Sequence, residues 1–153
     1  MQNEIIKMKG VYKFTLEDIF TGKKRVFEYE NLIPTVGRTA IADHLTNASP
    51  SPAVLRANYT ALGSGTTAPA NGDTQLETET FRKAIASQTK SNNIAYMTAF
   101  YTAAEAVATH REAGVFINGT GTANSGTLFS RVAINITKSG TETLTIDYSI
   151  TIS

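Results

Sequence analysis

Five side chains that could hold a cation or move a proton lie between residues 73 and 112. They are Asp73, Glu77, Glu79, His110 and Glu112. Asn71-Gly72-Asp73 is typical of an oxygen-rich loop, and Glu77 and Glu79 would share one face of a strand, as paired carboxylates do. The spacing matches neither an EF-hand nor a zinc site. We therefore expect Asp73 to cap a turn and Glu112 to form a salt bridge with Arg111, Arg82 or Arg131. No metal and no cofactor are expected.

Gly63-Ser64-Gly65 is a glycine-rich segment that could contact a phosphate or present a nucleophile. A phosphate-binding loop needs G-x-x-x-x-G-K-[ST] and a nucleophile elbow needs G-x-S-x-G, and neither pattern surrounds Ser64. Gly63 and Gly65 are therefore predicted to form a tight surface turn. The two histidines, His44 and His110, cannot be placed beside an acid and a nucleophile from sequence. These observations predict no catalytic residue and no enzymatic activity.

Basic and aromatic residues are neighbours at two places, which could provide a platform for stacking nucleic-acid bases. The residues are Phe81, Arg82, Lys83, Phe129 and Arg131. However, 14 Lys plus Arg stand against 13 Asp plus Glu, so the net charge is only +1. Phosphate binding needs a basic field, which this balance does not provide. We expect the rings to point into the core and the charges to reach solvent, with no nucleic-acid partner.

The composition is typical of a folded β protein of one domain. The chain has 153 residues, of which 41% are hydrophobic, 18% are charged and 23 are threonine, a good strand former. Because cysteine is absent, disulfides, thiolate zinc sites and cysteine nucleophiles are excluded. No apolar run approaches the roughly 20 residues of a membrane span, and Met1–Gly10 has no apolar core of a secretory signal. No membrane association is predicted, and synthesis is expected in the cytosol.

Apolar and polar residues alternate with period two along most of the chain, as they do in half-buried strands. The expected strands are 7–17, 26–30, 58–62, 81–88, 94–102, 112–117, 128–138 and 144–152. The last of these carries an apolar stripe backed by a hydroxyl-rich face that includes Thr143, Thr145 and Thr151, and the first carries a basic stripe of Lys7, Lys9 and Lys13. Segment 103–110 is expected to be a turn, because a lone helix of that length is marginal.

One helix is predicted over residues 36–46, with Thr35 as its N-cap and one face formed by Val36, Ala40, Ile41, His44 and Leu45. Two long loops rich in Gly and Thr, 63–74 and 118–126, separate strands. Short strands joined by turns favour a sandwich or barrel. The predicted fold is an all-β, single-domain antiparallel β-sandwich of jelly-roll type over residues 1–153, with about eight strands. Residues 1–10 are a possible N-terminal arm.

Several motifs follow one another in a characteristic order. They are Leu32-Ile33 with Gly37-Arg38, then YTALGSGTTAP (59–69), ETETFRK (77–83), REAGVF (111–116) and GTLFSR (126–131). This ordered set resembles a group of small structural proteins of tailed bacteriophages. The resemblance covers residues 31–152 and implies a non-enzymatic virion component of the tail, tail fibre, baseplate or head surface. It gives structural roles to Arg82, Glu112, Arg131, Gly63, Gly65 and Asp73, with Glu112 paired to Arg82 or Arg131 across strands.

The expected partners are further copies of the chain and other virion proteins. A low charge content favours repeated protein contacts, because interface centres are depleted in charge. The candidate contact residues are Ile5, Ile6, Met8, Thr143, Thr145 and Thr151. Capsid decoration or a head-fibre base is the alternative within this class. A carbohydrate-binding β module that recognises a host-surface glycan and a hydrolase with an unrecognised site are alternatives of other classes, although the two long loops contain no aromatic residue.

Overall fold

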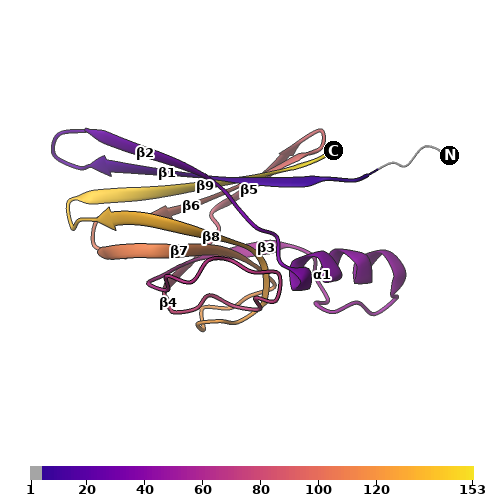
Figure 1. Cartoon of the computed structure of the whole chain (residues 1–153). Helices are drawn as coiled ribbons and strands as arrows, with labels where there is room; N and C mark the ends of the chain where they lie inside the picture. Colours follow the sequence, from indigo (N-terminus) through magenta and orange to yellow (C-terminus); the bar gives the residue numbers. More distant parts are fainter. Residues whose placement is uncertain (1–4) are drawn as a thin grey trace.

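The computed structural model describes residues 5–153, in which nine strands and one helix form two packed layers (Figure 1). The strands are β1 (Met8–Asp18), β2 (Lys24–Glu30), β3 (Ala57–Gly63), β4 (Glu79–Ala84), β5 (Ser87–Ser91), β6 (Ile94–Tyr101), β7 (Ala108–Ile117), β8 (Thr127–Lys138) and β9 (Glu142–Ile152). The helix α1 (Thr35–Thr46) follows β2. The predicted all-β sandwich is confirmed, with one strand more than expected.

The strands form two antiparallel sheets. Sheet A has the order β2-β1-β9-β6-β5, and sheet B has the order β4-β3-β7-β8. The first and last strands lie side by side, from Met8 opposite Ile152 to Asp18 opposite Glu142. Just beyond this ladder, Lys7 and Ser153 exchange two backbone hydrogen bonds of 2.5 and 2.8 Å.

The main core lies between the sheets and is formed by the apolar stripes seen in the sequence. In β1 it contains Tyr12, Phe14 and Leu16, and in β9 it contains Leu144, Ile146, Tyr148 and Ile150. Buried phenol groups join the layers, since Tyr12 bonds to Ser130 of sheet B and Tyr101 bonds to Thr60 at 2.7 Å. Burial raises the pKa of both phenols, which therefore remain neutral hydrogen-bonding groups.

Sheet B is buried on its outer face as well. Ala61, Leu76, Phe116 and Leu128 form a second, smaller cluster there. Leu76 belongs to the loop between β3 and β4 and is fully buried. Because both faces of β7 are covered, its residues 112–117 are buried without alternation.

Two segments differ from their sequence predictions. Residues 81–88 do not form one strand, because the chain changes sheets in the middle. The Ile85 N–H donates to Asn58 O in sheet B and the next N–H, of Ala86, donates to Thr98 O in sheet A. Segment 103–110 is only partly a turn, because β7 already begins at Ala108, where pairing with β8 supports the extended chain.

The helix also differs in detail. Thr35 is its first residue and not its N-cap, a position that Pro34 occupies without a side-chain hydrogen bond. Ala40 packs inside, as predicted, but Leu45 is 81% exposed. Leu45 lies in the last turn, and Figure 1 shows the far part of α1 extending beyond the sheets. The predicted apolar face is therefore buried only in its first part.

The predicted arm is shorter than residues 1–10. Met8, Lys9 and Gly10 are strand residues that pair with β9. Ile5, Ile6 and Lys7 precede the strand, and residues 1–4 lie outside the part of the chain that the structure describes.

Candidate interaction surfaces and the buried ion pairs

The Glu112 carboxylate is the centre of a buried polar network on the outer side of sheet B. Its side chain is 1% exposed and accepts backbone hydrogen bonds from Gly65 at 3.1 Å, Thr78 at 2.7 Å and Glu77 at 2.9 Å. Arg131 Nε donates to it at 3.0 Å. The strand register makes this contact diagonal: Arg131 of β8 pairs with Gly114 of β7, which lies two residues beyond Glu112 on the same strand. Of the three arginines proposed from the sequence, Arg131 is therefore the partner of Glu112.

Arg131 extends the network into loop 64–78, which joins β3 to β4. Its guanidinium is 3% exposed, bonds to Asp73 at 2.6 Å and donates to Thr67 O at 2.9 Å. Asp73 also accepts from Ala70 N at 2.8 Å, so it caps a turn as predicted. Burial raises the pKa of Asp73, but the Ala70 N–H and Arg131 outweigh it and hold this pKa below its ordinary value. The network therefore holds loop 64–78 on the sheet at two places: Glu112 binds the backbone of the loop, and Arg131 binds the loop residue Asp73.

Gly63 and Gly65 are required by the close approach of this carboxylate. A Cβ atom on either glycine would lie 2.5 Å from Glu112 Oε1, which no side chain tolerates. The backbone N–H of Gly65 can therefore reach the carboxylate only because the residue has no side chain. The sequence predicts a surface turn at the two glycines, but both are buried and pack against the Glu112 carboxylate.

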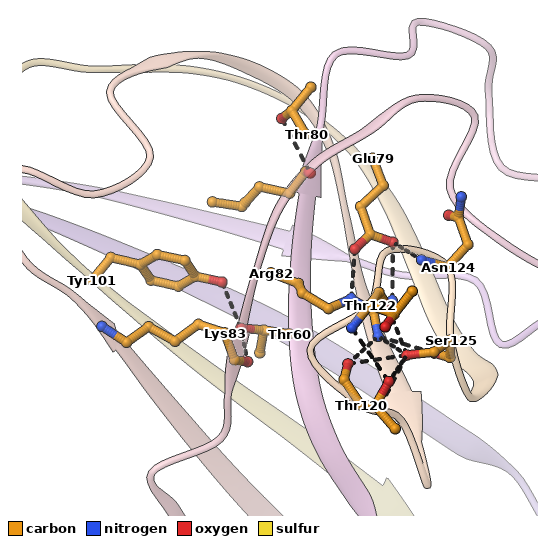
Figure 2. Close-up of polar contacts among 11 residues, drawn as sticks. Thr60, Glu79, Thr80, Arg82, Lys83, Tyr101, Thr120, Thr122, Asn124 and Ser125 are labelled. Carbon is orange, nitrogen blue, oxygen red and sulfur yellow. Dashed lines mark hydrogen bonds and ion pairs between the residues drawn. The ribbon is translucent and has the colours of Figure 1, made fainter.

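A second buried ion pair, between Arg82 and Glu79, holds the other long loop, 118–126 (Figure 2). The pair lies within β4 at 2.5 Å, with side chains 4% and 2% exposed. Arg82 Nη1 donates to Thr120 O at 2.9 Å and to Ser125 O at 3.0 Å, and Glu79 accepts from Asn124 N at 2.9 Å. The guanidinium also lies over the Phe116 ring, 4.5 Å from its centroid.

These arginines correct two sequence predictions. Arg82 and Arg131 do not reach solvent beside their aromatic neighbours, because each is buried with a carboxylate. Glu77 and Glu79 do not form a carboxylate pair, since Glu77 lies before β4 and bonds to Thr67 at 2.8 Å while Glu79 binds Arg82. The hydrogen bonds from Thr67 lower the pKa of Glu77. Within residues 5–153, no three His, Asp or Glu side chains are placed to hold a metal ion.

The two histidines lie apart from these carboxylates and have structural surroundings. His44 is half-buried and its Nε2 bonds to Pro52 O at 2.7 Å. His110 is 1% exposed, its Nε2 bonds to Ala106 O at 2.8 Å, and its Nδ1 has no partner. Burial lowers the pKa of His110, which favours the neutral ring.

The outer face of sheet A carries the threonines predicted to contact partners. Thr143, Thr145 and Thr151 are half-buried there, and the pairing aligns Thr145 with Thr15 and with Phe100, which is 45% exposed. The expected basic stripe of β1 is neutralised by its neighbours: Lys9 pairs with Glu30 at 2.7 Å, and Lys13 aligns with Glu28 and Asp147. The face is therefore rich in hydroxyl groups and nearly balanced in charge.

The two ends of the sandwich expose apolar side chains. At one end, Ile5 and Ile6 are 72% and 77% exposed, while Met8 is half-buried against the core. At the other end, the β1–β2 turn exposes 81% of Phe20. Asp18 Oδ1 fixes that turn by accepting from the backbone N–H groups of Phe20 and Thr21 at 2.9 and 2.8 Å.

Comparisons with protein-family models, with curated proteins and with solved structures find no match to this chain. Among residues 5–153 there is no helix with the length and apolar character needed to cross a membrane. The buried ion pairs were only partly foreseeable from sequence. All four residues lie in the phage-like motifs, but the partnership of Arg82 with Glu79 had only one signal of its own, a spacing of three residues.

Proposed function

We propose that the chain is a structural subunit of a tailed bacteriophage virion that associates with copies of itself and with other virion proteins. One observation carries the proposal: the motifs that resemble phage structural proteins supply both buried ion pairs. The motif residues Gly65, Glu112 and Arg131 meet in a single network together with Asp73, and the motif residues Glu79 and Arg82 form the second ion pair. The motif residues therefore hold the two long loops on sheet B, a role that suits a structural protein better than an enzyme.

The charged groups of these networks are unsuited to acid–base chemistry. A general acid or base must reach a substrate and change protonation near the working pH. Glu112 and Arg131 are each 3% exposed or less and are fully engaged with each other and with backbone groups. We propose that the protein has no enzymatic activity, and that its surfaces perform its function.

Within the virion, the proposed position is tail-associated, in the tail, baseplate or fibre, with capsid decoration or a head-fibre base as the alternative. A carbohydrate module would need an aromatic ring to pack against the sugar. The hollow over loop 64–78, lined by Thr67, Asp73, Gln75, Glu77 and Arg131, has no aromatic residue. This hollow therefore does not favour glycan binding.

The direct test is to look for the chain in particles. Virions of a phage that encodes it are purified, their proteins are identified by peptide mass spectrometry, and antibody-gold labelling is viewed by negative-stain electron microscopy. We expect peptides from the chain in washed particles and label at one repeated position. Presence in the lysate but absence from washed particles would contradict the proposal.

A further inference from the structure

An apolar groove of about 510 Å³ opens at the end of the sandwich where β1 begins and β9 ends. Its deepest lining residues, Met97, Ile117, Phe129 and Ile150, are core residues no more than 8% exposed. Its rim includes Leu55, Tyr96 and Ile152, which are 40–47% exposed. The groove is therefore a place where the main core is open to solvent.

The N-terminal segment of the same chain lies next to this groove but does not fill it. Lys7 is fixed to Ser153 by two backbone hydrogen bonds, and Met8, the next residue, lines the groove. Ile5 and Ile6, immediately before this anchor, remain 72% and 77% exposed. To enter its own groove, the segment would have to reverse direction at Lys7, which the pairing with Ser153 prevents. Within one chain, the apolar side chains of Ile5 and Ile6 therefore stay exposed to solvent, and the segment does not cover the groove.

We propose that the groove binds the Ile5–Ile6 segment of a second copy of this chain, an inference that rests on the self-association proposed above. The charges agree with this occupant. The charged residues that line the groove are Arg56 and Lys90, and the acid in the first six residues is Glu4. The other exposed apolar segment, at Phe20, is a less suitable occupant, because Asp18 already accepts the backbone N–H groups of Phe20 and Thr21 in a turn.

The groove also offers hydrogen bonds to an incoming backbone. A segment that leaves water must satisfy its own N–H and C=O groups. Strand β5 is an edge of sheet A, and its residues Gln88, Thr89 and Lys90 line the groove. An extended segment can add to such an edge as an extra strand. Because successive side chains point to opposite sides, one isoleucine enters the groove and the other covers its rim.

The absence of cysteine allows a direct cross-linking test in the full-length chain. Ile5→Cys and Leu55→Cys variants are purified separately, mixed under mild oxidation and analysed by mass spectrometry. We expect a disulfide-linked pair of one copy of each variant. The matched control pairs Ile5→Cys with Phe20→Cys, whose site is 81% exposed but lies at the far end of β1. Equal yields from both mixtures would overturn the proposal, as would a purely intrachain disulfide in the Ile5→Cys/Leu55→Cys double variant.

Light scattering separates this proposal from the proposed function. The variant Ile5→Asp/Ile6→Asp should weaken self-association by about tenfold or more, the effect of losing one buried isoleucine. Its melting temperature should match that of the wild type, because both side chains are exposed in the single chain. A variant that associates as tightly as an oligomeric wild type would overturn the arm contact and leave self-association standing. A wild type that stays monomeric at high concentration would overturn both.

Discussion

The outer faces of the two sheets differ in how they meet solvent. On sheet B, loops 64–78 and 118–126 cover the face, with Leu76 as an apolar plug and two buried Arg–carboxylate pairs. On sheet A, the outer face is open, and its ion pairs, Lys9–Glu30 and Lys24–Glu17, are largely in water. Buried pairs are costly to break singly, whereas exposed pairs contribute little. The covered face therefore fixes the fold, whereas the ion pairs of the open face contribute little to its stability.

The largest expected effect is the loss of the Glu112 carboxylate. Glu112→Ala leaves Arg131 and three backbone N–H groups without their acceptor, which should lower the free energy of unfolding by about 3–5 kcal/mol. Urea denaturation followed by circular dichroism measures this change. The control on sheet A is Glu17→Ala, whose exposed pair with Lys24 should contribute at most about 1 kcal/mol. Similar losses in both variants would remove the distinction between the faces.

A smaller loss is expected from Leu76→Ala, which empties the second cluster. We expect about 3 kcal/mol, toward the lower part of the range for buried leucines, because the loop can partly collapse. Limited proteolysis should also cut loop 64–78 faster. On sheet A, Val26→Ala serves as the control, since Val26 is 52% exposed and should change stability by no more than about 0.5 kcal/mol. Unchanged proteolysis of the Leu76 variant would show that the ion pairs alone hold the loop.

Acid should destabilise the fold in part through Asp73, which lies on the covered face. The folded-state pKa of Asp73 is lower than its ordinary value, so the unfolded chain takes up the proton first. Its contribution to stability is complete above about pH 4, the ordinary carboxyl range, and is lost as the pH falls through the folded pKa. Denaturation midpoints measured from pH 6 to pH 3 should therefore decline less in Asp73→Asn than in the wild type. Parallel declines would mean that Asp73 does not take part.

The smallest effect on stability is expected on the open face. Thr145→Lys adds a charge beside Thr15 and Phe100 but removes no buried group, so the free energy of unfolding should change by no more than about 0.5 kcal/mol. Self-association, measured by sedimentation velocity, should weaken, because interface centres exclude charge. The control is Ser139→Lys, in the β8–β9 turn. Equal association of both variants would exclude this face from the contact between copies.

The sequence predicts which segments form strands better than it predicts which strands pair with each other. The stripes from Tyr12 to Leu16 and from Leu144 to Ile150 identify core strands, because a period of two places one face inside. Pairing is different, because it joins distant segments. Nothing in the pattern of β1 shows that Lys13 lies between Glu28 and Asp147, so the sequence alone predicts a basic stripe where the fold balances the charge.

The prediction is weakest where local patterns and tertiary contacts disagree. Residues 81–88 alternate smoothly, yet the chain changes sheets at Ile85 and Ala86, because hydrogen bonds from both layers compete for it. The loop 64–78 consists of turn formers, and its one leucine, Leu76, gives no sign of a second core. Arg82 and Arg131 were expected at the surface, since burial of a guanidinium depends on carboxylates contributed by the fold.

The crossing at Ile85 and Ala86 has a mechanical consequence. Two successive peptide groups are bonded to opposite layers, one to Asn58 and the next to Thr98, at 2.9 and 2.8 Å. A shearing force that slides one layer over the other must strain both bonds at once, across a link too short to act as a spring. The two sheets are thus linked directly to each other at this edge. A force that slides sheet A along sheet B is therefore opposed at this edge by both hydrogen bonds.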